Sequence, residues 1–163
     1  MKATGIVRRI DDLGRVVVPK EIRRTLRIRE GDPLEIYTDP EGEVIFKKYS
    51  PIGDMSQVAV EFAETASSIL GGTVAVSDTD QFIAAAGKQK RQFDHDKIDT
   101  ELDHIIQSKD KFLSSKKVIV PIISQGDAIG SVTVLSPEGK ELGETEMKAA
   151  QIGAEFLAKQ IYD

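Results

Sequence analysis

The stretch that decides the fold lies near the start of the chain, at residues 11–26, and reads Asp-Asp-Leu-Gly-Arg-Val-Val-Val-Pro-Lys-Glu-Ile-Arg-Arg-Thr-Leu. Its first four residues are typical of a tight turn, in which Gly14 suits a positive φ. Three successive valines at 16–18 form a β-branched run that predicts a strand covered on both faces. Pro19 favours the first turn of a helix, because it has no N–H to leave unsatisfied there. The stretch therefore predicts a turn, a strand and a short helix.

The sequence around this stretch predicts further strands. The expected elements are a strand at 4–10, the strand at 15–18, a helix at 20–28, and a hairpin with strands at 34–39 and 43–49. Ile22 and Leu26 lie one turn apart and form the apolar stripe of the helix. Fifty residues make only a small core, and the valine run needs cover on both sides. We therefore expect two chains to interleave their strands in a dimer.

The charge of the chain is distributed unevenly. The formal net charge is −5, yet residues 1–29 hold nine basic and three acidic side chains. Seven of the eight arginines lie there: Arg8, Arg9, Arg15, Arg23, Arg24, Arg27 and Arg29. Three acids cannot neutralise nine bases, so a positive surface remains, which suits nucleic acid. Arginine also fits that role, because its planar fork can grip a phosphate or the O6/N7 edge of guanine.

Residues 51–163 hold 11 basic and 18 acidic side chains and follow a different pattern. The expected elements are helices at 56–70, 99–107 and 144–162, a hairpin with strands at 73–77 and 81–86, and a second hairpin with strands at 117–123 and 129–136. This order indicates an antiparallel sheet flanked by helices, and hence an α+β fold. The last helix has a wide apolar face, since Ile152 and Phe156 extend its main stripe. Such a face can cover a sheet and also meet a partner.

Four short motifs occur together in the first fifty residues: Gly14-Arg15, Val18-Pro19, Arg23-Arg24 and Glu30-Gly31-Asp32. Their order and spacing resemble the swapped-hairpin family of transition-state regulators typified by AbrB, over about residues 3–50. The resemblance implies a swapped-hairpin, dimeric β-barrel DNA-binding domain at 1–53. Members of a sporulation subgroup join it to a GAF-like sensor domain, which implies such a domain at 54–163. Carried over position by position, the DNA-contacting residues are Arg8, Arg15, Arg23 and Arg24, with Arg9, Lys20 and Lys2 in secondary positions.

The function implied by this resemblance is a DNA-binding transcriptional regulator, activator or repressor, that controls sporulation genes. Its partners would be double-stranded DNA and further copies of itself, as a homodimer and then a homotetramer. The GAF-like domain would serve assembly or the sensing of an unknown small molecule. An antitoxin-like module that neutralises a partner protein is the alternative, because some antitoxins share the small fold. A folded second domain favours the regulator, since antitoxins usually end in a disordered tail.

Several other classes of function find no support in the sequence. The chain has no cysteine, which removes disulfides, thiolate metal sites and cysteine nucleophiles. No Gly-x-Ser-x-Gly elbow or His-Glu-x-x-His motif occurs, so we expect neither an enzyme nor a cofactor. His95 and His104 lie among acidic residues in a spacing that favours a solvated surface over a metal site. No signal segment or membrane span is recognisable, and we expect a cytoplasmic protein.

Overall fold

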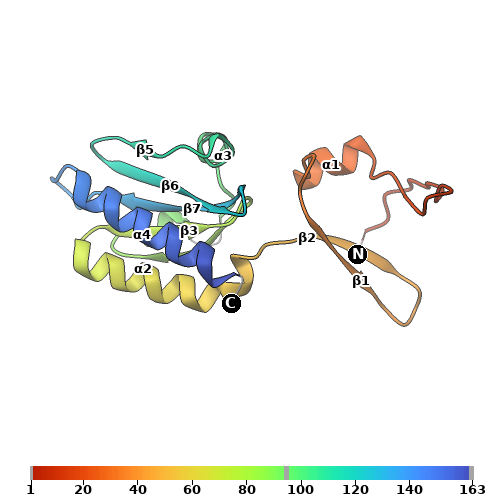
Figure 1. Cartoon of the computed structure of the whole chain (residues 1–163), viewed down its shortest axis with the longest axis horizontal. Helices are drawn as coiled ribbons and strands as arrows, with labels where there is room; N and C mark the ends of the chain where they lie inside the picture. Colours follow the sequence, from red (N-terminus) through yellow and green to blue (C-terminus); the bar gives the residue numbers. More distant parts are fainter. Residues whose placement is uncertain (1, 94–95, 162–163) are drawn as a thin grey trace. The chain divides into compact units, whose positions relative to one another are not determined.

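The computed structural model describes residues 2–93 and 96–161. The chain forms two compact units, and the division falls between Tyr49 and Ser50. The first unit contains α1 and a two-stranded sheet, and the second contains a five-stranded sheet with three α-helices (Figure 1). Ser50 to Gly53 belong to the second unit, where Ile52 is fully buried.

The first unit contains the predicted helix and the predicted hairpin of strands 34–39 and 43–49. Helix α1 spans Lys20–Leu26, and strands β1 (Leu34–Thr38) and β2 (Val44–Lys48) pair antiparallel with Ile36 opposite Phe46. The helix ends two residues before the expected position, because Arg27 takes a left-handed conformation with φ 55°. The N–H of Ile28 then donates to the carbonyl of Arg23 at 2.8 Å, which closes the helix end.

The two strands expected at 4–10 and 15–18 do not form in the single chain. Both segments are without regular secondary structure and belong to no sheet, and among the described residues of this unit only β1 and β2 form a ladder. The turn between them is present, with Gly14 at φ 76° and its N–H donating to the carbonyl of Asp11. A strand is stable only when a neighbouring strand accepts and donates its backbone hydrogen bonds. The predicted neighbouring strands belong to a second chain.

The first unit leaves most of its apolar side chains uncovered. Pro19 is its one buried residue among positions 2–49. Exposed apolar side chains come from every segment of the unit: Val7, Ile10, Leu13, Val16, Val17, Leu26, Ile36, Tyr37, Val44, Ile45, Phe46 and Tyr49. Val7 and Val17 expose 84% and 69% of their surface. An exposed apolar surface of this size is typical of an interaction face.

The second unit is built on an antiparallel sheet in the order β4-β3-β7-β6-β5. Its elements are α2 (Ser56–Leu70), β3 (Thr73–Ser77), β4 (Phe82–Ala86), α3 (Thr100–Ser108), β5 (Phe112–Leu113), β6 (Lys117–Ser124), β7 (Asp127–Leu135) and α4 (Glu144–Gln160). Short 3-10 helices, η1 and η2, span Gly53–Met55 and Lys90–Phe93. The predicted α+β class is confirmed, and the short elements β5, η1 and η2 were not expected.

The sheet has a separate apolar core on each face. Alternate residues of β6 point to opposite faces, so Val118 and Val120 join one core and Ile119 joins the other. Helices α2 and α4 cover the first face, as Figure 1 shows, and Gly153 of α4 lies against the ring of Phe62 in α2. Helix α3 covers the second face. No helix among the described residues is long and apolar enough to cross a lipid bilayer.

Candidate nucleic-acid interface

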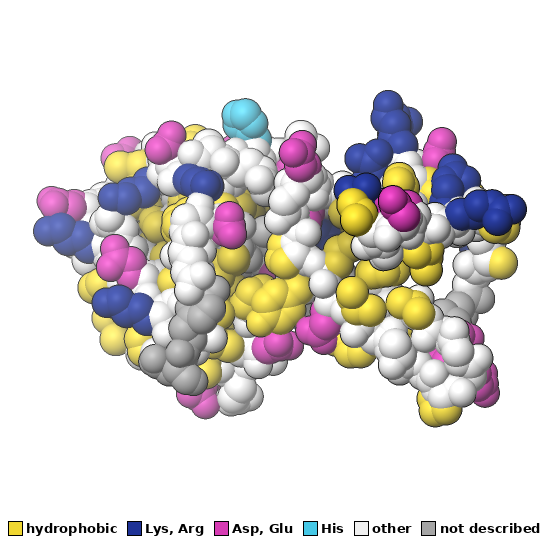
Figure 2. Space-filling view, turned by 45° about the vertical axis from the view of Figure 1, so that its right-hand side comes forward, with side chains coloured by type: hydrophobic (Ala, Val, Ile, Leu, Met, Phe, Trp, Pro, Cys, Tyr) yellow, Lys and Arg dark blue, Asp and Glu magenta, His cyan; other side chains and the backbone are white. Residues whose placement is uncertain are grey.

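The basic residues predicted to contact DNA are all exposed in the structure. Arg8 and Arg9 lie in the irregular segment before the first turn, and Arg15 ends that turn. Lys20, Arg23 and Arg24 lie on α1, and Lys2 is exposed near the start of the chain. In the first unit, Lys and Arg side chains gather along one side, at the upper right of Figure 2. Exposed, weakly paired cations of this kind can neutralise the phosphates of a duplex.

The turn before Arg15 is organised by the carboxylate of Asp11. Its Oδ1 accepts hydrogen bonds from the N–H groups of Leu13 and Arg15 at 2.9 and 2.8 Å. Its Oδ2 accepts the Nε–H of Arg15 at 2.8 Å, which makes an ion pair. These contacts, led by the N–H of Arg15, lower the pKa of Asp11 below its ordinary value. The turn therefore holds both the backbone and the side chain of Arg15.

The hairpin between β1 and β2 uses the same type of turn. Asp39 Oδ1 accepts the N–H groups of Glu41 and Glu43, and Gly42 has φ 90°. The N–H of Glu43 is the main cause that lowers the pKa of Asp39. Both turns thus follow the pattern Asp-x-x-Gly-x, with Arg15 at the last position of one and Glu43 at the last position of the other. The shared geometry does not depend on an arginine.

Helix α1 is fixed at both ends by contacts that sequence reasoning did not find. Arg23 Nε donates to the carbonyl oxygen of Val18 at 3.1 Å, which ties the helix to the segment before it. Lys48 Nζ, from β2, donates to the carbonyl oxygen of Arg27 at 3.0 Å. A cation at this end also suits the helix dipole. The orientation of Arg23 and Arg24 is therefore set by the backbone before α1 and by β2.

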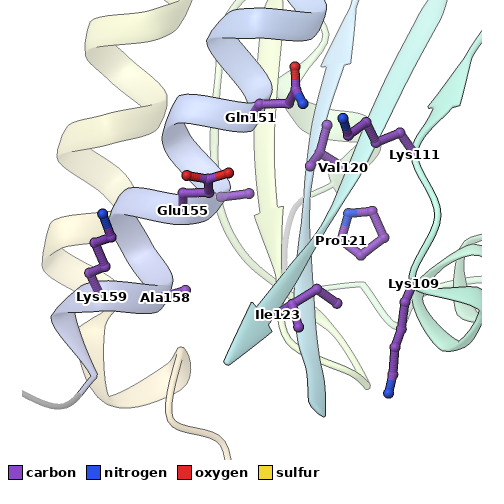
Figure 3. A pocket seen from close by; sticks show the side chains of 10 residues that line it. Lys109, Lys111, Val120, Pro121, Ile123, Gln151, Glu155, Ala158 and Lys159 are labelled. Carbon is purple, nitrogen blue, oxygen red and sulfur yellow. The ribbon is translucent and has the colours of Figure 1, made fainter. Parts of the chain in front are cut away.

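The second unit has an excess of acidic side chains over residues 51–163 and several hollows on its surface. A groove of about 430 Å³ lies between α4 and β6, and Figure 3 shows Lys111 and Glu155 on opposite sides of it. A cavity of about 280 Å³ lies on the α3 face and is lined by Phe82, Phe93 and Thr133 among others. His104 is exposed on α3, and His95 lies outside the described residues. Among residues 2–93 and 96–161, one group of acidic side chains lies close enough together to hold a metal ion. It consists of Asp39, Glu41 and Glu43 in the first unit.

Two family models match the chain. The C-terminal model of stage V sporulation protein T, described as a transcription factor, matches residues 54–162. Stage V sporulation protein T of Bacillus subtilis is 46% identical over an alignment of 177 residues, which covers 99% of each chain. The chain belongs to the stage V sporulation protein T family. The second model, of the MazE antitoxin, matches residues 7–54.

Other relatives of this stage V sporulation protein T family member match only part of the chain. The transition state regulatory protein AbrB of Bacillus subtilis is 51% identical over 77 residues, 47% of this chain and 78% of AbrB. The solved N-domain of AbrB is 65% identical over 30% of this chain and 92% of that domain, with a TM-score of 0.28. The GAF domain of an Acinetobacter phosphoenolpyruvate-protein phosphotransferase is 9% identical and covers 66% of this chain and 81% of that domain, with a TM-score of 0.57. The second unit therefore has the GAF-like fold.

Proposed function

We propose that this chain is a DNA-binding transcriptional regulator of sporulation genes. In this proposal the first unit binds double-stranded DNA as an interleaved dimer, and the second unit assembles the chains. Membership of a family described as transcription factors supports the regulatory role. The observation that carries the DNA-binding role is the excess of positive charge over residues 1–29, where nine basic side chains stand against three acids and the predicted contact residues are exposed.

The uncovered apolar surface of the first unit supports the dimer. A unit of about fifty residues without disulfide or metal is marginal on its own. Here the apolar side chains of the segments at 4–10 and 15–18 and of the hairpin remain exposed in the single chain. A second copy of the same unit would cover them and supply the missing strand neighbours. Oligomerisation thereby accounts both for the exposed valines and for the unpaired segments at 4–10 and 15–18.

An antitoxin-like role is the second candidate. The match of the MazE antitoxin model to residues 7–54 favours it, because that model describes toxin recognition. The match covers only the first unit, whereas the sporulation family accounts for the longer, folded second unit. A partner toxin would bind the apolar faces, and DNA would bind the arginines. Binding of duplex DNA therefore separates the two candidates.

The salt dependence of DNA affinity tests the proposed role. Each dimer presents Arg8, Arg15, Arg23 and Arg24 twice, and each phosphate contact releases a counterion. If about six to eight arginines engage phosphates, log K against log salt concentration should have a slope of roughly −5 to −7. Fluorescence anisotropy of a labelled duplex at several salt concentrations measures this slope. A slope shallower than about −2 would reject this surface as the DNA face.

The outer face of the second unit supports a role in assembly. Ile152 and Phe156 lie one turn apart on α4 and expose 70% and 47% of their surface. Ile69, near the end of α2, exposes 78%. Both helices pack on the same face of the sheet, so their outward apolar side chains can meet a second copy. Linking two DNA-binding dimers would raise affinity through effective concentration, without any new DNA contact.

Replacing Ile152 and Phe156 together by glutamate is expected to reduce a tetramer to a dimer. Charged residues would then lie where apolar side chains meet across the interface. Light scattering of the full chain measures the change, and DNA affinity should fall with it. Gln107→Glu, at an exposed position on α3, adds charge on the opposite side of the sheet from this patch and should leave the tetramer intact. A double variant with the mass of the wild-type assembly would show that α4 is not an assembly face.

Ligand sensing is a further candidate role for the second unit. The observation that favours it is the cavity of about 280 Å³ on the α3 face. The hydroxyl of Thr133, which lines this cavity, is buried and has no hydrogen-bond partner within the described part of the chain. Buried polar atoms normally have a partner, so a bound molecule would satisfy it. Such a ligand could regulate DNA binding only if it preferred one state of assembly.

A further inference from the structure

We propose that Asp11 is a positioning residue that holds the Arg15 guanidinium for reading bases, and that it thereby sets sequence specificity more than affinity. The proposal rests on the proposed DNA-binding function. It concerns a residue that the resemblance to known regulators does not place among the DNA contacts. The motivating contact is the 2.8 Å ion pair between Asp11 Oδ2 and Arg15 Nε.

The ion pair engages Arg15 through Nε and leaves the edge with the two Nη groups available to DNA. Asp11 engages Nε, whereas the two terminal Nη groups make no ion pair with a described residue. A pair of parallel hydrogen bonds from one arginine is the usual way to recognise guanine through its O6 and N7. An exposed arginine otherwise samples many rotamers, and ordering it on binding costs free energy. Asp11 reduces that cost by holding the side chain in advance.

The charge of Asp11 argues for specificity and against a role in general affinity. A carboxylate beside a phosphate-binding arginine repels the phosphate and weakens electrostatic attraction to any duplex. The arginines of α1 do not have such a partner: Arg23 Nε donates to the neutral carbonyl of Val18, and Arg24 makes no ion pair that the described structure records. Arg23 and Arg24 therefore suit phosphates, whereas Arg15 suits a base edge.

The two oxygens of Asp11 have separable tasks. Oδ1 accepts the backbone N–H groups of the turn, and Oδ2 accepts Arg15. The turn at Asp39 has matching Oδ1 contacts with Glu43 in place of the arginine, so these backbone contacts do not require an arginine at the last position. Asparagine keeps an acceptor oxygen for the backbone and replaces the second oxygen by an NH₂ group, which cannot accept from Nε. Asp11→Asn thus releases Arg15 and retains the turn.

The test compares Asp11→Asn with Asp12→Asn in the full chain. Both variants remove one negative charge, but the Asp12 side chain takes no part in the hydrogen bonds of the described turn. Each is titrated with a duplex that the wild-type chain selects from a random pool and with a shuffled duplex of the same composition. For Asp11→Asn we expect the ratio of selected to shuffled affinity to fall about tenfold, with affinity for shuffled DNA unchanged or raised. Asp12→Asn should raise both affinities and leave the ratio unchanged.

A double-mutant cycle completes the test. In an Arg15→Lys background, which lacks the fork, Asp11→Asn should no longer change the ratio. The proposal is overturned if Asp11→Asn behaves like Asp12→Asn, or if its effect persists in the Arg15→Lys background. Loss of binding to both duplexes by Asp11→Asn alone would mean an unfolded turn and a structural role, which also overturns it. Failure of the wild-type chain to bind any duplex would instead refute the proposed function.

Discussion

Replacing Arg23 and Arg24 together by alanine is expected to lower the affinity for duplex DNA about a thousandfold near 0.1 M salt, since a dimer then loses four phosphate contacts. Both side chains are exposed on α1, and backbone hydrogen bonds close the C-terminal end of the helix. Arg23 does donate to Val18, but an exposed hydrogen bond of this kind contributes little to stability. The loss should therefore appear in binding and not in folding.

Anisotropy titration measures this loss, and circular dichroism verifies that the double variant is folded. Arg91→Ala is the matched control, because Arg91 is the one arginine outside residues 1–29 and is exposed on η2. It should bind DNA like the wild-type chain. A double variant that binds as tightly as Arg91→Ala would remove α1 from the interface. An unfolded double variant would show that these arginines are structural.

Val17→Asp is expected to abolish the folded dimer of the first unit and to leave the second unit folded. Val17 is largely exposed in the single chain, and the proposed dimer buries it against the partner's strands. An uncompensated charge at a buried position destabilises by about 3–5 kcal/mol, which exceeds what so small a unit can lose. Hydrogen exchange of the full chain measures the outcome: β1 and β2 should lose protection, whereas β6 and β7 keep it.

Thr4→Asp is the control for this prediction. It places the same charge at another exposed position of the same unit, where no apolar side chain is replaced. Its β1 and β2 amides should stay protected. Protection of β1 and β2 in Val17→Asp equal to that in Thr4→Asp would show that the valine run is a free surface. The interleaved dimer would then be wrong.

Elements whose stability is local could be predicted from the sequence. Helix α2 begins and ends at the predicted residues, because its apolar period and the following Gly71, at φ 78°, both act within the chain. The β1–β2 hairpin is confirmed for the same reason. The strands at 4–10 and 15–18 were predicted as strands and are unpaired in the single chain, because their hydrogen-bond partners are not local. Strand β5 has two residues, too few to show a period.

The basic residues of the candidate site were predicted from the sequence, but the residues that hold them in place were not. Arginine type and number identified the basic surface, which is a compositional signal. Lys48 was missed because it reaches Arg27 across 21 positions, and no periodicity records such a contact. The role of Asp11 in the turn could have been predicted, because the pattern Asp-x-x-Gly-x occurs at both 11–15 and 39–43. Comparison of those two turns would have singled out Arg15 as the one that adds an ion pair.

The most direct test of DNA binding by the first unit is a hydrogen-exchange map of the full chain with and without duplex DNA. We expect slower exchange on DNA binding in residues 6–27, which include the Asp11 turn and α1, because these segments carry the contacting arginines. The sheet of the second unit should exchange at the same rate in both states. Protection confined to residues 50–161, with residues 6–27 unchanged, would contradict the claim that the basic surface of the first unit binds DNA.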